Sequence, residues 1–185
     1  KLAVKVTYTN DFNLVTTKDE AIVNAIQEII LDNITFKTFD RSKLFLNVNS
    51  KNFILQSNDK SKTELNLKGE NTFIELSKNT SLKALINSTN LKCDLYQKAT
   101  VTLEGDANNS TLRLDNSAEL SARNFNSKNT DVTIEGNASC SLLTENTIVI
   151  AATDKTEIEL YGSPKIEIRK LAGEAKLLKK PTTKK

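Results

Sequence analysis

A short pattern of apolar and polar positions recurs from Val101 to Ile168, in which two aliphatic residues flank one polar residue. Such alternation with a period of two is typical of a strand with one buried face, because successive side chains on a strand point to opposite faces. The pattern predicts short strands. The triplets are Val101-Thr102-Leu103, Leu112-Arg113-Leu114, Leu120-Ser121-Ala122, Val132-Thr133-Ile134, Cys140-Ser141-Leu142, Ile148-Val149-Ile150, Ile158-Glu159-Leu160 and Ile166-Glu167-Ile168.

From Leu44 onward these triplets form two interleaved series, each with a mean step close to 19 residues. A repeat near 20 residues, made of strands without helices, is typical of a solenoid whose coils stack on one another. The first series starts its triplets at Leu44, Leu65, Ala84, Val101, Leu120, Cys140, Ile158 and Ala175. The second starts at Ile34, Phe53, Ile74, Cys93, Leu112, Val132, Ile148 and Ile166.

The coil length selects the kind of solenoid. A coil of about 19 residues with two short strands places equivalent strands of successive coils in parallel, about 4.8 Å apart. Inward positions then form dry aliphatic columns, and connections between parallel strands of one sheet are right-handed in nearly all cases. The sequence therefore predicts an all-β protein, a right-handed parallel β-helix with coils of about 19 residues.

The first forty residues follow this pattern less clearly. Val4, Val6 and Tyr8, followed by Phe12 and Leu14, predict two short strands joined by residues 9–11. Residues 17–31 fit either a helix or strands, because they combine a capping-box spacing with many β-branched residues. We favour strands there.

The corners of the coils carry residues that tolerate positive φ. Gly69, Gly105, Gly136 and Gly162 each follow a strand-ending Leu or Ile by two residues, and Asn116 follows Leu114 in the same way. A phosphate-binding loop is the functional alternative, but the chain has neither a Gly-x-Gly-x-x-Gly motif nor a Walker-type lysine. We expect these residues to form turns.

Composition and charge fit one domain with a separate tail. The chain has 185 residues, of which 38% are hydrophobic and 26% charged, and it contains no Trp. We expect a single β-helix domain over residues 1–178, filled by Leu, Ile, Val and Ala, and a basic, disordered tail over residues 179–185. Residues 165–185 carry eight basic and two acidic residues, which leaves 18 basic and 21 acidic residues elsewhere.

The same features narrow the classes of partner and location. No aromatic residue is interleaved with the bases of the tail, so we expect no nucleic acid partner. No stretch has the roughly 18 apolar residues of a transmembrane segment, and the first six residues lack the apolar region of a secretory signal. Met is absent, including at position 1. We therefore expect a processed or truncated chain whose targeting segment, if any, lies upstream.

Side chains that support common chemistry are scarce. The chain has no His, which removes His-dependent nucleophiles and most zinc sites, so we expect no cofactor and no metal site. Cys93 and Cys140 occupy inward positions more than two coils apart. A separation above about 9 Å exceeds the roughly 7 Å limit for a disulfide, so we expect two free, buried thiols.

One outward column combines two carboxylates, Glu75 and Asp94, with Arg113 and then Thr133. Stacked one coil apart, the two carboxylates would lie about 5 Å from each other, a spacing that serves glycoside cleavage in other folds. We expect Arg113 to neutralise Asp94, and a solvated row of charges is the simpler interpretation. If the face were enzymatic, Glu75 and Asp94 would be the candidate catalytic residues.

The chain resembles the putative auto-transporter adhesin, head GIN domain family between Leu44 and Leu178. The residues that carry the resemblance are the segment from Leu160 to Ile166, LYGSPKI, and the corners Gly105-Asp106-Ala107, Asn116-Ser117-Ala118 and Gly136-Asn137-Ala138. The resemblance implies a right-handed β-helix in a bacterial envelope or secreted protein of unassigned function. It transfers no catalytic or binding residue. The chain departs from the family in having only five Gly.

These observations give three hypotheses of function. The first is a non-enzymatic β-helix of the bacterial cell envelope, or a secreted one, that serves as an adhesin or structural protein with an unknown surface ligand, a carbohydrate or a protein. The second is a self-assembling scaffold, because the terminal coils expose strand edges that could pair copies into a homo-oligomer. The third is a polysaccharide-active β-helix enzyme that uses Glu75 and Asp94.

Overall fold

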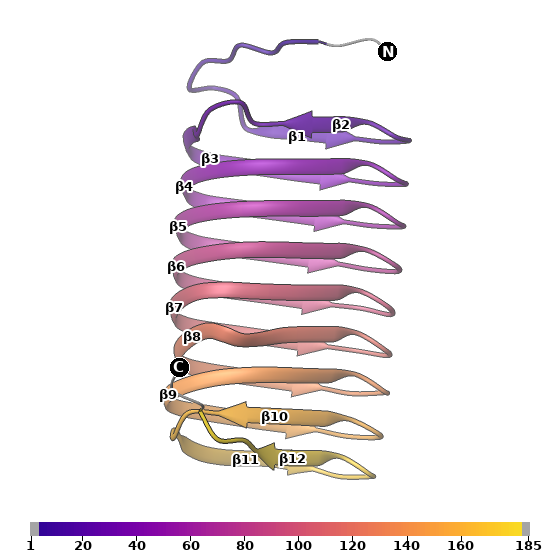
Figure 1. Cartoon of the computed structure of the whole chain (residues 1–185), viewed down its shortest axis with the longest axis vertical. Coiled ribbons are helices and arrows are strands. Elements are labelled where there is room, and N and C mark those ends of the chain that lie inside the picture. Colours follow the sequence, from indigo (N-terminus) through magenta and orange to yellow (C-terminus); the bar gives the residue numbers. More distant parts are fainter. Residues whose placement is uncertain (1–3, 183–185) are drawn as a thin grey trace.

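The computed structural model describes residues 4–182, which form one stack of parallel strands in about nine turns (Figure 1). None of the described residues is helical, and all strand pairs are parallel. The predicted all-β parallel β-helix with coils of about 19 residues is confirmed. The strands are β1 (Leu14–Thr17), β2 (Ile22–Asn24), β3 (Ile29–Thr38), β4 (Lys43–Ser57), β5 (Lys62–Leu76), β6 (Ser81–Leu95), β7 (Thr100–Leu114), β8 (Glu119–Ile134), β9 (Ser139–Ala152), β10 (Glu157–Tyr161), β11 (Lys165–Leu171) and β12 (Lys176–Lys179).

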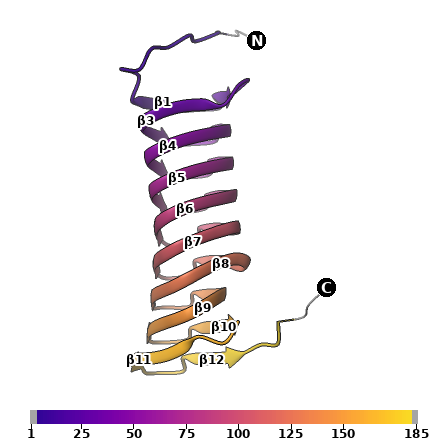
Figure 2. The same cartoon turned by 90° about the vertical axis from the view of Figure 1, so that its left-hand side faces the viewer.

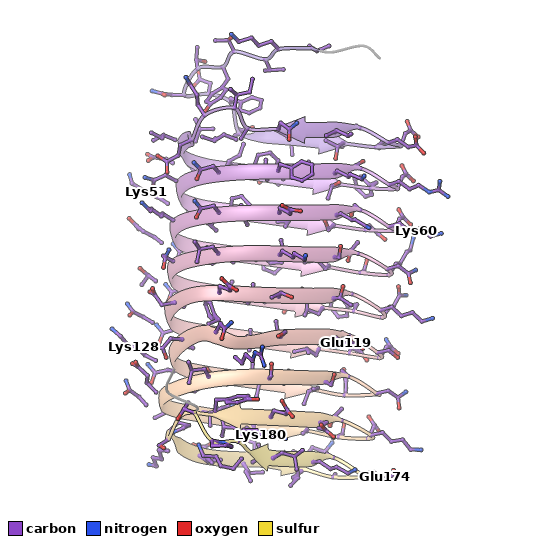
Figure 3. All side chains as sticks on the ribbon, in the orientation of Figure 1. Lys51, Lys60, Glu119, Lys128, Glu174 and Lys180 are labelled. Carbon is purple, nitrogen blue, oxygen red and sulfur yellow. The ribbon has the colours of Figure 1, made fainter. Side chains whose placement is uncertain are left out.

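Each long strand from β4 to β9 covers both broad sides of the stack. In β4, pairing with β5 runs to Ser50 and resumes at Asn52, so Lys51 lies at a bend between them. We call residues 43–49 and their equivalents the first face, and residues 52–57 and their equivalents the second face. Figure 2 looks onto the edge formed by the bends. Lys51 and Lys128 lie along this edge and extend into solvent (Figure 3).

Aliphatic side chains stack inside the solenoid in columns that run from coil to coil. In the second face one column passes without interruption through β4 to β9, and its side chains are at most 4% exposed. Its contacts are between like apolar groups at the spacing of neighbouring strands, which excludes water. The column consists of Leu55, Ile74, Cys93, Leu112, Val132 and Ile150.

The interior is not the wholly aliphatic one that the sequence predicts. Next to the bend, Ser and Thr side chains point inward and form hydroxyl pairs across the narrow end of the coil. Thr72 Oγ1 lies 3.0 Å from Ser88 Oγ, and the Ser127 hydroxyl donates to Ser110 Oγ at 2.9 Å. Small side chains fit where the two faces converge, and each buried hydroxyl has a partner there, as burial of polar groups requires.

The turn that closes each coil differs from the predicted glycine corner. Seven residues other than Gly have φ between 58° and 67° at this turn, one in each of seven coils. Gly136 and Asn116 are turn residues with positive φ, as predicted, whereas Gly69 pairs with Ser50 at the bend and has no positive φ. Asn and Asp tolerate the left-handed region because their short side chains hydrogen-bond locally. The seven are Asp19, Asp40, Asp59, Lys78, Gln97, Asn116 and Asp154.

The predicted turn at Gly105 is wrong, because Gly105 lies within β7 on the first face, although its φ is positive. Its φ is 104°, and a Cβ there would come within 2.1 Å of the Ile86 carbonyl oxygen. In the next coil Phe125 occupies the paired position and is 3% exposed. A side chain at Gly105 would therefore collide with the backbone of the coil before, at Ile86.

The N-terminal segment is partly strand. Residues 17–31 contain no helix and contribute to β1, β2 and β3, so the interpretation as strands is confirmed. The two strands predicted around Val4, Val6, Tyr8 and Phe12 are absent, and β1 begins only at Leu14. A turn at residues 10–11 is present, with the Phe12 N–H donating to the Thr9 carbonyl at 3.1 Å. Isolated alternation is not sufficient, because a strand needs a neighbour to pair with.

The boundary of the basic tail remains a prediction. Strand β12 extends to Lys179, and the Lys180 N–H still donates to the Leu160 carbonyl at 2.9 Å, after which the chain leads away from the stack (Figure 2). Residues 183–185 and residues 1–3 lie outside the described part of the chain.

Candidate binding surface

A row of asparagines follows the start of the second face, immediately after the bend. Each amide Nδ2 donates to the Oδ1 of the asparagine one coil earlier, at 2.8–3.2 Å. The Thr147 hydroxyl closes the row by donating to Asn129 Oδ1 at 2.7 Å. Parallel pairing in register places the same position of each coil one strand spacing from the next, so identical side chains bond repeatedly. The row consists of Asn33, Asn52, Asn71, Asn90, Asn109 and Asn129.

The row keeps unused hydrogen-bonding capacity. An asparagine side chain has two N–H donors and one oxygen with two lone pairs. Within the row Asn90 uses one donor, toward Asn71, and one lone pair, toward Asn109. One N–H and one lone pair of each interior amide remain free, and the side chains from Asn33 to Asn109 are exposed. The surface thus presents a donor and an acceptor about every 4.8 Å along the axis.

A shallow groove runs beside the row across four coils, and we call it the asparagine groove. Its volume is about 370 Å³. One wall is the amide row, and the other is the next outward column of the second face. The lining side chains are Asn52, Asn71, Asn90 and Asn109 on the first wall, Ile54, Phe73, Lys92 and Thr111 on the second, and Phe53, Thr72 and Leu91 between them.

The second wall combines an aromatic ring with a single charge. Phe73 is half-buried, and Lys92 Nζ lies 5.0 Å from the centroid of its ring. Lys92 Nζ also forms an ion pair with Asp94 Oδ2 at 3.3 Å. The ammonium group is therefore held by a ring and a carboxylate at once, and among the residues lining the groove it is the only formal charge.

The predicted carboxylate column lies directly beside this groove. Glu75, Asp94, Arg113 and Thr133 are register neighbours in successive coils, as predicted. The predicted neutralisation of Asp94 by Arg113 is wrong: Lys92 pairs with Asp94 from the same strand.

Arg113 bonds elsewhere. Its Nη2 donates to Glu135 Oε1 at 3.1 Å, and its guanidinium lies 5.7 Å from the Tyr96 ring centroid. Asp94 is only 8% exposed. Burial and the nearby negative charge of Asp94 raise the pKa of Tyr96. The two candidate carboxylates thus stand in a partly covered network of charges and rings rather than in a cleft.

A second shallow depression lies on the first face, and we call it the Phe45 groove. Its volume is about 540 Å³, and it carries the exposed apolar side chains of Phe45 and Leu85 between Glu64, Lys83 and Glu104. It is larger than the asparagine groove, but its outward side chains change character from coil to coil. It offers no repeated arrangement of donors and acceptors.

The two cysteines take no part in either groove. Both are free and buried, as predicted. Burial raises the pKa of the Cys140 thiol to about 12 and raises that of Cys93 as well. Thiols in this state are poor nucleophiles and poor metal ligands.

Within residues 4–182 no three His, Cys, Asp or Glu side chains gather in a way that could hold a metal ion. The described part of the chain also has no helix with the length and apolar character needed to cross a membrane.

The asparagine row was not among the predicted columns, although its signal is present in the sequence. Its residues recur at steps of 19, 19, 19, 19 and 20. The aliphatic triplets mark only the inward positions of each coil. The asparagines repeat with the same period of about 19 residues but at an exposed position, which the aliphatic pattern does not indicate.

Comparison with known proteins gives one match. The family model described as "Putative auto-transporter adhesin, head GIN domain" matches residues 1–164. No curated protein and no solved structure matches the chain.

Proposed function

The chain belongs to the putative auto-transporter adhesin, head GIN domain family, and from this premise we propose that it is a non-catalytic, rigid binding head that holds an extended polysaccharide in the asparagine groove. The observation that carries the proposal is the free N–H and free lone pair on each interior amide of the row. Polysaccharides repeat hydroxyl groups along their length, and hydroxyls both donate and accept hydrogen bonds.

The walls of the groove support a carbohydrate rather than a peptide. Phe73 and Ile54 offer apolar surface to the faces of sugar rings, while the asparagine amides can hydrogen-bond to the sugar hydroxyls. A peptide strand would instead need a free backbone edge, and the backbone of β4 to β7 is paired on both sides. An open, shallow site fits a long ligand that contacts several coils weakly and gains affinity by their sum.

Glycan-array screening of the purified chain, followed by calorimetric titration of the strongest polysaccharide, tests this function. Asn90→Ala removes the amide at the centre of the groove, and the loss of two ligand hydrogen bonds is expected to weaken binding about tenfold. The matched control is Asn66→Ala on the first face, where binding should be unchanged. Absence of any bound glycan, or equal affinities for the two variants, would contradict the proposal.

An enzyme acting on the same ligand is the alternative that this experiment separates. Glu75 and Asp94 stand next to the groove, so a bound polysaccharide would pass within reach of them. We expect no release of reducing ends from the bound polysaccharide. If the wild type releases reducing ends and the Asp94→Asn variant does not, the protein is a glycoside hydrolase and not a binding head.

We also propose that the protein acts at the cell envelope or after secretion. The family description, an adhesin of the auto-transporter kind, supports this location. Fractionation of the source cells, with an antibody against the folded domain, should find the protein in the envelope or the medium. Its recovery in the cytoplasmic fraction alone would contradict the location without affecting the test of ligand binding.

A further inference from the structure

The segment from Val4 to Tyr8 is a strand sequence without a partner. Val4, Val6 and Tyr8 alternate with Lys5 and Thr7, the pattern of a half-buried strand. Yet Val4 and Val6 are 75% and 64% exposed, and residues 4–8 pair with no strand of the described chain. Tyr8 stacks on Phe12, and the segment crosses above the first coil (Figure 1).

The opposite end of the solenoid has a strand that lacks a neighbour. Strand β11 pairs with β9 on one side, and no described strand lies on its other side. Its inward side chains continue the buried columns of β9 but are not covered. Ile166, Ile168 and Leu171 are 42%, 48% and 46% exposed, whereas their partners in β9 are fully buried. Such an edge is a template for strand addition.

The free strand and the free edge cannot meet within one molecule. They lie at opposite ends of the stack, about nine turns apart (Figure 1). At 4.7–4.9 Å for each turn, the separation is about 40 Å. A second copy of the chain can bring them together.

We propose that residues 4–8 of one copy add to β11 of another as a parallel strand, which joins copies head to tail. In parallel orientation Val4 covers Ile166, Val6 covers Ile168 and Tyr8 covers Leu171. Arg169 stays out of register, as it does where β11 pairs with β9. An antiparallel strand would also cover the three apolar side chains, with Val6 over Ile168, but it would place Lys5 opposite Lys170, so two like charges would face each other.

Charge selects the register. With Val4 over Ile166, Lys5 lies opposite Glu167. A shift of two residues in one direction places Lys5 opposite Lys165, and a shift in the other direction places it opposite Lys170. A shift of one residue turns the valines to solvent. Opposite charges facing each other across neighbouring strands stabilise a sheet, and like charges destabilise it.

Because each copy has one donor strand and one acceptor edge, the contact does not close on itself and produces open chains of copies. Sedimentation velocity over a concentration series measures this directly. The mean mass of the wild-type chain should rise with concentration from that of one chain, 20.5 kDa. Val6→Asp disables the donor and Ile168→Asp disables the acceptor, so each variant alone should remain a single chain.

The mixture of the two variants is the decisive measurement. Val6→Asp keeps a working acceptor and Ile168→Asp keeps a working donor, so an equimolar mixture should form a two-chain species and nothing larger. Ile30→Asp is the matched control, because Ile30 is also an exposed aliphatic residue, at 64%, but lies in neither segment. It should assemble like the wild type. Single chains of the wild type at every concentration, or a mixture that grows beyond two chains, would overturn the proposal.

Exchanging the charges of Lys5 and Glu167 tests the register. It also replaces the mixing experiment if circular dichroism shows that either Asp variant is unfolded. Lys5→Glu and Glu167→Lys, each alone, should lower the association constant by about 1.4- to fivefold, which corresponds to 0.2–1 kcal/mol for one cross-strand pair. The double variant should recover the wild-type constant. Failure of the double variant to recover would exclude the pairing of Lys5 with Glu167 and thus the proposed register.

Discussion

Replacing Asn90 by Ala removes two bonds from the asparagine row, the one it donates to Asn71 and the one it accepts from Asn109, both at 3.0 Å. A hydrogen bond contributes a net 0.5–1.5 kcal/mol, and exposed ones lie in the lower half of that range because water replaces the lost partner. The free energy of unfolding should fall by about 1–2 kcal/mol. Asn66→Ala is the comparison, since Asn66 makes a single such bond, to Asn47 at 3.2 Å.

Urea unfolding followed by far-ultraviolet circular dichroism measures both variants against the wild type. The loss for Asn90→Ala should be about twice that for Asn66→Ala, with the slope of the unfolding free energy against urea unchanged in both. Equal losses would refute the reasoning, because the number of bonds removed would then not determine the effect. So would a loss below about 0.3 kcal/mol for Asn90→Ala, since the row would then contribute nothing measurable.

Three other predictions concern the interior and the turns. Thr63 is 2% exposed and its hydroxyl has no hydrogen-bond partner in the described chain, so Thr63→Val should raise the free energy of unfolding by about 1 kcal/mol in the same urea assay; a loss of stability would show that the hydroxyl is satisfied. Cys93 and Cys140 should not react with a thiol reagent at pH 8 until urea unfolds the chain, because burial raises both pKa values, that of Cys140 to about 12; rapid labelling of the folded protein would contradict their burial. The backbone N–H of Gly136, followed by the Thr153 hydroxyl, lowers the pKa of Asp154 below its ordinary 3.8, so this carboxylate stabilises the fold above about pH 4 and loses that effect as the pH falls through its lowered pKa. The stabilities of the wild type and Asp154→Asn should therefore converge in acid, and parallel curves would contradict this.

Aliphatic periodicity was sufficient to predict the architecture but not the exact columns. The triplets beginning at Ile74, Cys93 and Leu112 do mark one continuous buried column. In the coil before, the predicted triplet begins at Phe53, which pairs with Thr72 and not with Ile74. Thr72 points inward like Phe53, but because it is polar the aliphatic pattern in its coil begins two residues later, at Ile74. A polar residue that is satisfied by a hydroxyl across the bend cannot be distinguished from an exposed one by hydropathy.

The turns and the binding surface were harder to predict for related reasons. Glycine is the usual signal for positive φ, whereas here residues such as Asp40, Asp59 and Gln97 adopt it, held by pairing with the coils on either side. The backbone of a turn is thus fixed by its neighbours as much as by its own residue. The exposed amides of Asn71 and Asn90 satisfy one another only after the coils are stacked, so nothing local to either residue indicates their role.

The near-constant coil length has a mechanical consequence. Backbone hydrogen bonds between coils run along the axis of the stack, so a pull on the two termini loads one terminal coil at a time. Each released coil frees about 19 residues, which extend to about 65 Å at 3.3–3.6 Å per residue. After the lost rise of about 5 Å is subtracted, a force-extension trace should show a sawtooth with steps of about 60 Å. Under tension the molecule would then lengthen by fixed increments and dissipate mechanical energy as each coil unfolds.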